Sequence, residues 1–332
     1  MKLRDIEFGP VWDASGVRGF FGEGYWYHGL FRRFGLDFTG STFVAKTTTL
    51  MPRTGNMKLK RNGFTPRHFF PNCVIVKSVK GVVLNAVGLS GPGAEFLLAK
   101  GYWQERQKPF MISFMAVEKT AEKRRWELEQ FLVLLKSKLP DFHAPIAIQL
   151  NDSCPNVDHR YSDFELEVCQ AIGLVNKHLP NVPVIPKCNL LVPIPVLLRI
   201  GEHLGCDAIC LSNAIPWGEL PEDIDWKELF GSLESPLEQR GYSPGGLSGW
   251  PLLKLLCDYL DLLRRRNFSK PICAGGGILK PEDLAKIKLA GGDKVQAVSI
   301  GSVAMLRPWR VQPIIKEAHK LFGKLSSKQL PP

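Results

Sequence analysis

The sequence predicts an α/β fold, a (β/α)8 barrel with inserted loops and extended segments over the carboxyl-end face of its strands. Eight short apolar runs occur along the chain, and amphipathic helical patterns follow most of them, which is typical of a parallel sheet. Polar or glycine-rich clusters follow several of these runs, at the positions where a barrel presents its functional groups. The chain has 332 residues, of which 45% are hydrophobic, enough for one large core. We therefore expect one domain over residues 1–325 and a short tail over 326–332, with a doubly wound sheet as the second choice.

The expected elements alternate along the chain. Strands are expected at Val11–Ala14, Phe43–Lys46, Phe110–Met115, Ile146–Leu150, Val182–Lys187, Ala208–Ser212, Ile272–Gly275 and Ala297–Ile300. Helices are expected at Thr120–Leu139, Phe164–His178, Pro193–Leu204, Pro251–Arg265, Pro281–Leu289 and Val303–Leu321. Two stretches interrupt the repeat. Met51–Gly88 contains many Pro and Gly breakers, and Ala214–Gly246 is a long segment rich in Pro, Gly and acids. Long loops on the carboxyl side of a barrel usually shape its site.

Composition narrows the classes of function. No run of eighteen apolar residues occurs, and the first residues have the pattern of neither a signal nor a transit peptide, so we expect a cytoplasmic protein without a membrane partner. The eight cysteines include no CxxC pair, so we expect no metal site. The net charge is +11, but the Lys/Arg clusters are short and dispersed. Solvated surface groups explain them without a nucleic-acid partner.

The most informative stretch is Asn151-Asp152-Ser153-Cys154-Pro155-Asn156, which follows an apolar strand-like run. A thiol at the carboxyl end of a barrel strand can act as a base or as a nucleophile. A buried structural Cys in a turn is the alternative, and the hexapeptide alone does not separate the two.

Three glycine-rich elements lie late in the chain. Gly245–Gly249 is expected to open a helix, Gly275–Gly277 follows the seventh strand, and Gly301-Ser302 follows the eighth strand and opens the last helix. Glycines let backbone amides approach an anion, and the loops after strands seven and eight are the usual phosphate site of a barrel. Together they favour a bound phosphate over ordinary turns.

Two lysines and four asparagines stand at expected strand ends. A Lys that points into a barrel mouth is costly unless an anion pairs with it, so Lys46 and Lys187 indicate an anionic ligand if they are not surface residues. A single Asn is commonly a turn residue, but four at strand ends indicate a flat, amide-rich ligand. The four are Asn85, Asn151, Asn156 and Asn213.

These motifs, in this order, resemble the dihydroorotate dehydrogenase family, whose members are FMN-containing TIM barrels. The resemblance extends from about Phe8 to Pro308. Its marks are Asp13-Ala14-Ser15-Gly16, Lys46-Thr47-Thr48-Thr49, Asn85-Ala86-Val87-Gly88-Leu89, the Cys154 element, Lys187, Ser212-Asn213 and the three glycine-rich elements. The Asn-x-Ser-Cys-Pro-Asn element is similar to that of the soluble class 1 enzymes, in which Cys is the base.

The resemblance implies oxidation of (S)-dihydroorotate to orotate in de novo pyrimidine (UMP) biosynthesis, with Cys154 as general base and hydride transfer to FMN. It implies catalytic roles for Lys46 and Lys187 beside the flavin. Implied FMN-binding residues are Ala14, Ser15, Gly16, Lys46, Thr47, Asn151, Lys187, Ser212, Gly249, Gly276, Gly277, Gly301 and Ser302. Implied substrate-binding residues are Lys46, Asn85, Val87, Gly88, Leu89, Asn151, Asn156, Asn213 and Ala214. A homodimer is also implied, and an electron-transfer partner subunit is an option.

Departures from the family pattern keep alternatives open. Ala214 stands where the family commonly has Ser or Thr, and Ser90-Gly91 replaces the usual Pro-Asn. Another cyclic amide is therefore an alternative substrate. A tRNA-dihydrouridine synthase is the alternative enzyme, although only about 25 residues follow Pro308, too few for its helical RNA-binding domain. A flavin-binding protein without catalysis is a third alternative.

The electron acceptor stays open among fumarate, NAD through an iron–sulfur partner subunit, and quinone.

Overall fold

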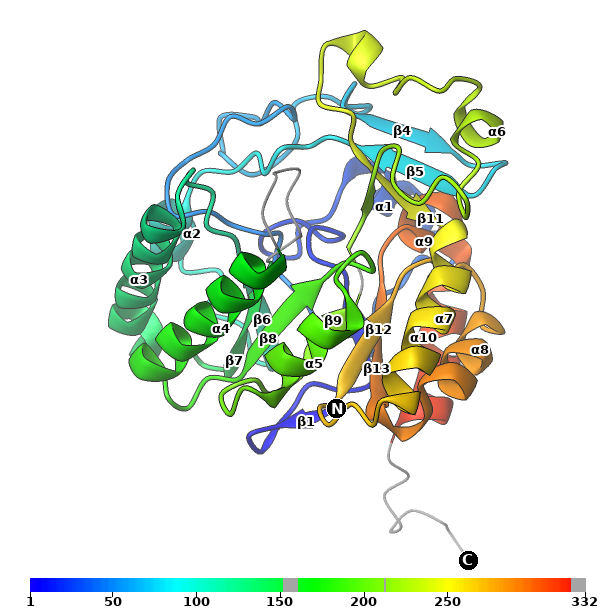
Figure 1. The fold of residues 1–332 in the computed structure, drawn as a ribbon. Coiled ribbons are helices and arrows are strands. Elements are labelled where there is room, and N and C mark those ends of the chain that lie inside the picture. Colours follow the sequence, from blue (N-terminus) through cyan, green and yellow to red (C-terminus); the bar gives the residue numbers. More distant parts are fainter. Residues whose placement is uncertain (152–160, 212, 324–332) are drawn as a thin grey trace, which may run out of the picture.

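The computed structural model describes residues 1–151, 161–211 and 213–323. Its centre is a curled parallel sheet with the strand order β3-β13-β12-β9-β8-β7-β6. Helices surround this sheet (Figure 1). The strands are β3 (Val11–Asp13), β6 (Phe110–Phe114), β7 (Ile146–Leu150), β8 (Val184–Cys188), β9 (Ile209–Leu211), β12 (Ile272–Gly275) and β13 (Val295–Ile300). This arrangement confirms the α/β, barrel-like fold that the sequence predicts.

The segment 42–48 joins the two edges of this sheet. It forms parallel bridges from Thr42 to Trp12 on one side and from Val44 to Met111 on the other. The expected strand Phe43–Lys46 is therefore wrong as a regular strand, although its residues lie in the barrel wall. The reason is local: the Lys46 N–H donates to the Gly19 carbonyl at 2.9 Å, which turns it away from the neighbouring strand.

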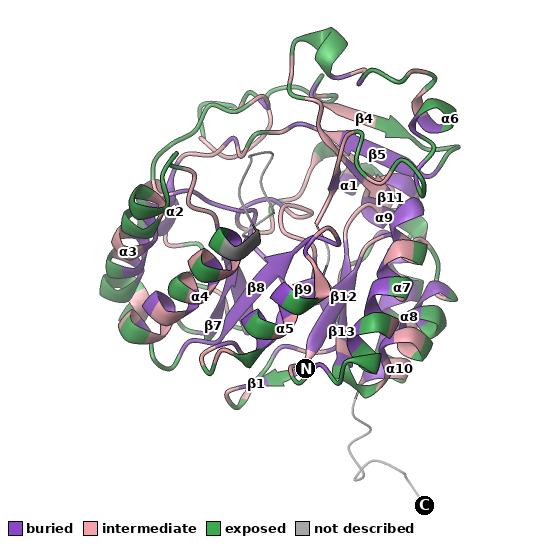
Figure 2. Ribbon diagram, viewed as in Figure 1, coloured by how far each residue is buried: buried purple, intermediate pink, exposed green. Residues whose placement is uncertain are grey.

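The outer helices bury one face each against the sheet and expose the other (Figure 2). They are α2 (Ala94–Ala99), α3 (Ala121–Lys138), α4 (Tyr161–His178), α5 (Ile194–Glu202), α7 (Pro251–Arg265) and α8 (Asp283–Gly291). In α3, the Thr120 hydroxyl accepts from the Lys123 N–H and caps the first turn. Its buried residues Leu128, Phe131 and Leu135 recur at helical spacing and form the face that packs on the sheet.

The last expected helix, Val303–Leu321, is wrong as one continuous element. The chain instead forms α9 (Val303–Leu306), a 3-10 turn at Pro308–Arg310, and α10 (Val311–Phe322). Pro308 is the physical reason, because proline has no N–H to donate and disfavours helical geometry in the residue before it. Arg307 indeed has φ −146° and ψ 58°.

A second, antiparallel sheet lies over the carboxyl ends of the barrel strands (Figure 1). Its order is β10-β11-β5-β4, with β4 (Val74–Lys77), β5 (Val82–Asn85), β10 (Ile215–Pro216) and β11 (Gly246–Gly249). The expectation that Gly245–Gly249 opens a helix is therefore wrong. Residues 246–249 pair with Val82–Asn85 as a strand, and α7 begins only at Pro251. The two segments expected to interrupt the repeat supply this sheet, together with α6 (Trp226–Phe230).

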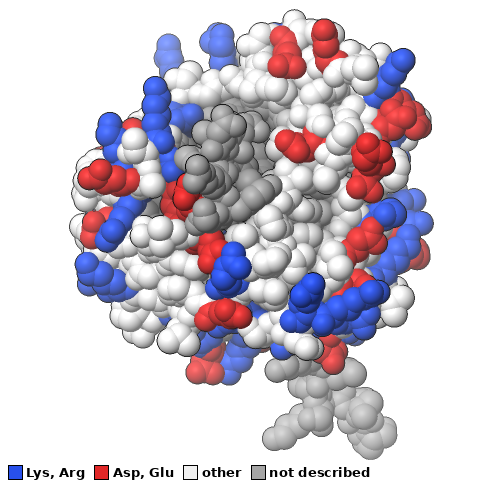
Figure 3. Space-filling view, in the orientation of Figure 1, with Lys and Arg blue, Asp and Glu red and all other residues white. Residues whose placement is uncertain are grey.

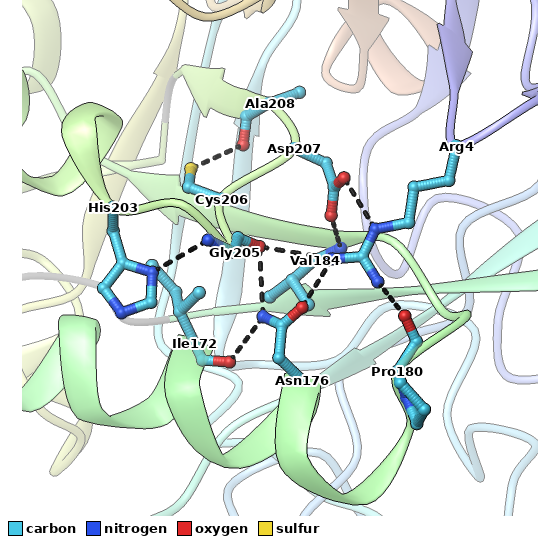
Figure 4. Close-up of polar contacts among 10 residues, drawn as sticks. All are labelled: Arg4, Ile172, Asn176, Pro180, Val184, His203, Gly205, Cys206, Asp207 and Ala208. Atoms are coloured by element: carbon cyan, nitrogen blue, oxygen red, sulfur yellow. Dashed lines mark hydrogen bonds and ion pairs between the residues drawn. The ribbon is translucent and has the colours of Figure 1, made fainter.

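The amino-terminal end of the barrel is closed by a short hairpin of β1 (Lys2–Leu3) and β2 (Ile6–Glu7). Met1, Leu3 and Phe8 pack against buried residues of the barrel strands. From the turn of this hairpin, the Arg4 guanidinium reaches α4 and the loop before β9 (Figure 4). It donates to Asp207 Oδ1 at 2.8 Å and to Asn176 Oδ1 at 2.6 Å, which ties the hairpin to the barrel.

On the face shown in Figure 3, charged side chains lie in small groups of both signs. This distribution agrees with the interpretation of the Lys/Arg clusters as solvated groups. In the part of the chain that the structure describes, no helix has both the length and the apolar character needed to cross a bilayer.

Candidate functional site

A cavity of about 1210 Å³ opens at the carboxyl ends of the barrel strands, beneath the antiparallel sheet. It brings together every predicted site residue that the structure describes. They are Ala14, Ser15, Gly16, Lys46, Thr47, Asn85, Val87, Gly88, Leu89, Asn151, Lys187, Asn213, Ala214, Gly249, Gly276, Gly277, Gly301 and Ser302. Cys154, Asn156 and Ser212 lie outside the described residues.

Lys46 is a buried cation in this cavity, with 8% of its surface exposed. Its ammonium donates to the Ser90 carbonyl and lies 4.6 Å from the centre of the Phe20 ring. Burial lowers the pKa of Lys46 to about 8, and the Glu23 carboxylate opposes that shift by attraction. Lys46 is therefore not the solvated surface residue that was the alternative.

Lys187 lies in β8 and is 6% exposed. Burial lowers its pKa from the ordinary lysine value, and the thiols of Cys210 and Cys273 are the nearby groups that oppose the shift. Lys187 stands in register with Cys210 on β9, and Cys210 with Cys273 on β12. Among the described residues, no carboxylate lies within ion-pair distance of Lys46 or Lys187. A buried ammonium without a counter-ion is costly, so the cavity is suited to an anionic ligand.

A chain of hydrogen bonds crosses the floor of the cavity from strand to strand. The Thr47 hydroxyl lies 2.8 Å from the Ser15 hydroxyl and 2.9 Å from the Ser113 hydroxyl. Asn151 Nδ2 donates to Thr47 Oγ1 at 3.0 Å, and Asn213 Nδ2 donates to Asn151 Oδ1 at 2.7 Å. Each side chain orients the next one, so the amides are held in place before a ligand binds.

Glycines form the side of the cavity between α7 and α9. Gly249, Gly276 and Gly277 have φ values of 124°, 119° and 75°, a region that side-chain-bearing residues rarely adopt. A Cβ on Gly277 would lie 2.4 Å from the Leu253 nitrogen, and one on Gly249 would lie 2.3 Å from the Gly81 carbonyl oxygen. Glycine is therefore required at both positions for the main chains to pack closely. Both residues also line the cavity, where their main chain is suited to a phosphate group.

The loop after β5 forms another wall. Asn85 Nδ2 donates to the Gly246 carbonyl at 3.4 Å, and Asn56 Nδ2 donates to the Ala86 carbonyl at 2.6 Å. Leu89 has φ 57°, an uncommon value for a residue with a side chain. These contacts place Val87, Gly88 and Leu89 against the cavity.

Three residues of the site were not among those predicted from the sequence. Ser113 belongs to the hydroxyl chain, Ser90 accepts from Lys46, and the Tyr25 hydroxyl donates to the Gly16 carbonyl at 2.6 Å. A polar residue inside the apolar run Phe110–Phe114 was an available signal for Ser113. No local signal marked Tyr25 or Ser90, because their roles depend on partners that are distant in the sequence.

The described residues fit a flavin mononucleotide. The glycine side suits its phosphate, the two buried ammoniums suit an electron-rich ring, and the fixed amides suit a planar ring with hydrogen-bonding edges. In the described ranges, no group of three His, Cys, Asp or Glu side chains lies together so that it could hold a metal ion.

Comparison with known proteins finds one family. A family model described as dihydroorotate dehydrogenase matches residues 3–322. A protein of Listeria innocua named dihydroorotate dehydrogenase B (NAD(+)), catalytic subunit, is 29% identical over 97% of this chain and 92% of its own. A protein of the same name from Anoxybacillus flavithermus is 29% identical over 95% of this chain and 88% of its own.

Proposed function

Because the chain belongs to the dihydroorotate dehydrogenase family of oxidoreductases, we propose that it oxidises (S)-dihydroorotate to orotate with FMN as its cofactor, in de novo pyrimidine (UMP) biosynthesis. The observation that carries the proposal is the pair of buried lysines, Lys46 and Lys187, which share one cavity with a glycine cradle and have no carboxylate partner among the described residues. The family match weighs against the alternative of a tRNA-dihydrouridine synthase.

In the proposed oxidation, different residues have different roles. Cys154 removes a proton from the dihydropyrimidine ring. FMN, when bound, supplies the hydride acceptor. Lys187 would stabilise negative charge on the flavin ring, and Lys46 would touch both flavin and substrate. Their burial strengthens these interactions, because the surrounding medium screens them weakly.

The remaining predicted residues bind and orient. Gly249, Gly276, Gly277, Gly301 and Ser302 hold the phosphate with backbone amides. Asn85, Asn151, Asn156 and Asn213 hold the amides and carboxylate of the substrate. Loss of one hydroxyl at Ala214, compared with the family pattern, leaves that side of the pocket less polar.

The test is anaerobic mixing of the purified yellow protein with L-dihydroorotate, with flavin absorbance and orotate formation followed together. Bleaching with one orotate formed per flavin supports the proposal. If the flavin stays yellow with dihydroorotate and bleaches with another dihydropyrimidine, the cyclic-amide alternative replaces it. A protein purified without flavin that does not bind added FMN contradicts the cofactor assignment.

We further propose that the electrons leave through a partner subunit to NAD+, rather than to fumarate or quinone. The names of the relatives support this choice, since they specify NAD(+) and a catalytic subunit. A homodimer of this chain stays a prediction, which light scattering of the purified protein tests.

A further inference from the structure

Three aromatic side chains form an exposed group at the opening of the cavity. They are Trp26 of α1 (Trp26–Arg32) and Phe69 and Phe70 of the segment 65–71, and we call them the aromatic platform. Their exposed fractions are 41%, 68% and 77%. Exposed clusters of large apolar side chains are rare on monomers and mark interaction sites. Trp and Phe are also enriched at the centres of protein interfaces.

The platform is held in place by contacts within the chain. The Trp26 ring centre lies 5.5 Å from that of Phe69 and 5.0 Å from that of Phe70. Trp26 Nε1 also donates to the Phe69 carbonyl at 2.6 Å. Because the three rings already restrict one another, they lose less side-chain freedom when a partner binds than isolated residues would.

The platform is continuous with the proposed redox site. Trp26, Phe69 and Phe70 line the cavity that contains Lys46 and Lys187, although none of the three is among the residues proposed to hold FMN or substrate. Tyr25, which precedes Trp26, donates its hydroxyl to the Gly16 carbonyl in the proposed FMN-binding loop. A partner that covers the platform therefore comes next to the cofactor site.

Basic side chains predominate along the segments that carry the platform, although the exposed Glu23 lines the same cavity and the exposed Asp37 directly follows residue 36. Residues 24–36 and 57–71 contain six Lys and Arg and no Asp or Glu. All six are exposed: Arg32, Arg33, Lys58, Lys60, Arg61 and Arg67. A rim in which positive side chains predominate favours and steers a partner with acidic groups around an apolar centre.

We propose that the aromatic platform and its basic rim are the docking surface for an electron-transfer protein with an acidic rim and an apolar anchor. This inference rests on the proposed function. Dihydroorotate loses one hydride and one proton. The two electrons of the hydride cross this surface to the partner and reduce NAD+ to NADH, and one proton is released.

A protein is favoured over a lipid surface because α1 has only seven residues, short for a helix that lies along a membrane.

Two variants test the surface in the flavin-loaded protein. Phe69→Ser with Phe70→Ser removes the apolar anchor, and Arg33→Glu with Arg61→Glu reverses charge on the rim. Leu289→Ser and Arg266→Glu are controls, since Leu289 is exposed on α8 and Arg266 is exposed in the turn that follows α7. The partner is the NAD-linked electron-transfer subunit from the same organism. Its affinity is measured by calorimetry, and dihydroorotate-dependent NADH formation is measured alongside.

Each test variant is expected to weaken partner binding at least tenfold and to lower NADH formation in parallel, while reduction of a small dye by dihydroorotate stays unchanged. Added salt is expected to weaken binding of the wild type more than that of the charge-reversed variant. Unchanged affinity in both test variants overturns the proposal. So does wild-type binding to phosphatidylglycerol vesicles, lost in the variants, without binding to the subunit. Absence of dye reduction in the wild type contradicts the proposed function instead, and the binding result still decides the surface.

Discussion

Asn213 donates a hydrogen bond from its side-chain amide to the Asn151 side-chain oxygen at 2.7 Å, across the gap between the ends of two barrel strands. Asn151 in turn donates to Thr47. The orientation of one proposed substrate-binding amide therefore depends on the other, and the hydroxyl chain from Ser15 to Ser113 holds both. The site is built from residues that support one another laterally, at the ends of different strands.

This relationship predicts that Asn213→Ala weakens substrate binding more than flavin binding. Loss of one partly buried hydrogen bond is expected to cost about 1–2 kcal/mol, or roughly a tenfold rise in KM for dihydroorotate. Steady-state kinetics and the ratio of flavin to protein measure the two effects. Asn72→Ala, an exposed position that does not line the cavity, is the control. Loss of flavin with unchanged KM would place Asn213 at the cofactor instead.

Lys46 predicts a pH-dependent stability in the flavin-free protein. Its pKa of about 8 lies below the ordinary value of 10.5, so the folded state binds the proton more weakly than the unfolded state. Below pH 8, the buried charge of Lys46 lowers the free energy of unfolding by about 3 kcal/mol. This destabilisation declines as the pH rises towards 10.5. The unfolding free energy of the wild type should therefore rise relative to Lys46→Met between pH 8 and 10. Denaturant titrations at several pH values measure the difference, and a constant difference contradicts the burial argument.

The proposed role of Cys154 as general base predicts that flavin reduction depends on this side chain. Cys154→Ser should retain FMN and slow its reduction by dihydroorotate roughly 10²- to 10⁴-fold, because an alcohol is a far weaker base near neutral pH than a thiolate. Anaerobic stopped-flow absorbance measures the rate. Cys257→Ser, at a half-buried position on α7, is the matched control and should behave as wild type. Reduction of the Cys154 variant at the wild-type rate would show that another group takes the proton.

The contacts of Arg4, which lie far from the cavity, predict an effect on stability and not on catalysis. Its contacts with Asp207 and Asn176 are partly buried, so Arg4→Ala should lower the free energy of unfolding by about 1–3 kcal/mol without changing the flavin-reduction rate. Lys2→Ala is the control. Its ion pair with Asp5 is exposed, and its loss should leave the unfolding transition unchanged. Equal denaturation midpoints for the two variants would contradict a closing role for the hairpin.

The barrel and most of its site could be predicted because their signals are local. An apolar run of strand length that ends in polar residues reports both a strand and its functional end, as at Ile146–Leu150 followed by Asn151. A prediction that failed concerns a segment whose secondary structure depends on pairing with distant strands. Gly246–Gly249 is a strand because β5 and β10 lie on either side of it, and no local pattern announces such neighbours.

The sequence by itself determined the order of strands and helices, the polar residues at the strand ends and the family, because hydrophobic periodicity and short motifs are properties of neighbouring residues. Only the tertiary structure decided which of these residues meet. Lys46 and Lys187 are buried cations in one cavity. Trp26 contacts Phe69, 43 positions away, in the aromatic platform. The physical reason is that burial, ion pairing and ring contacts depend on partners brought together by closure of the barrel, which local sequence does not specify.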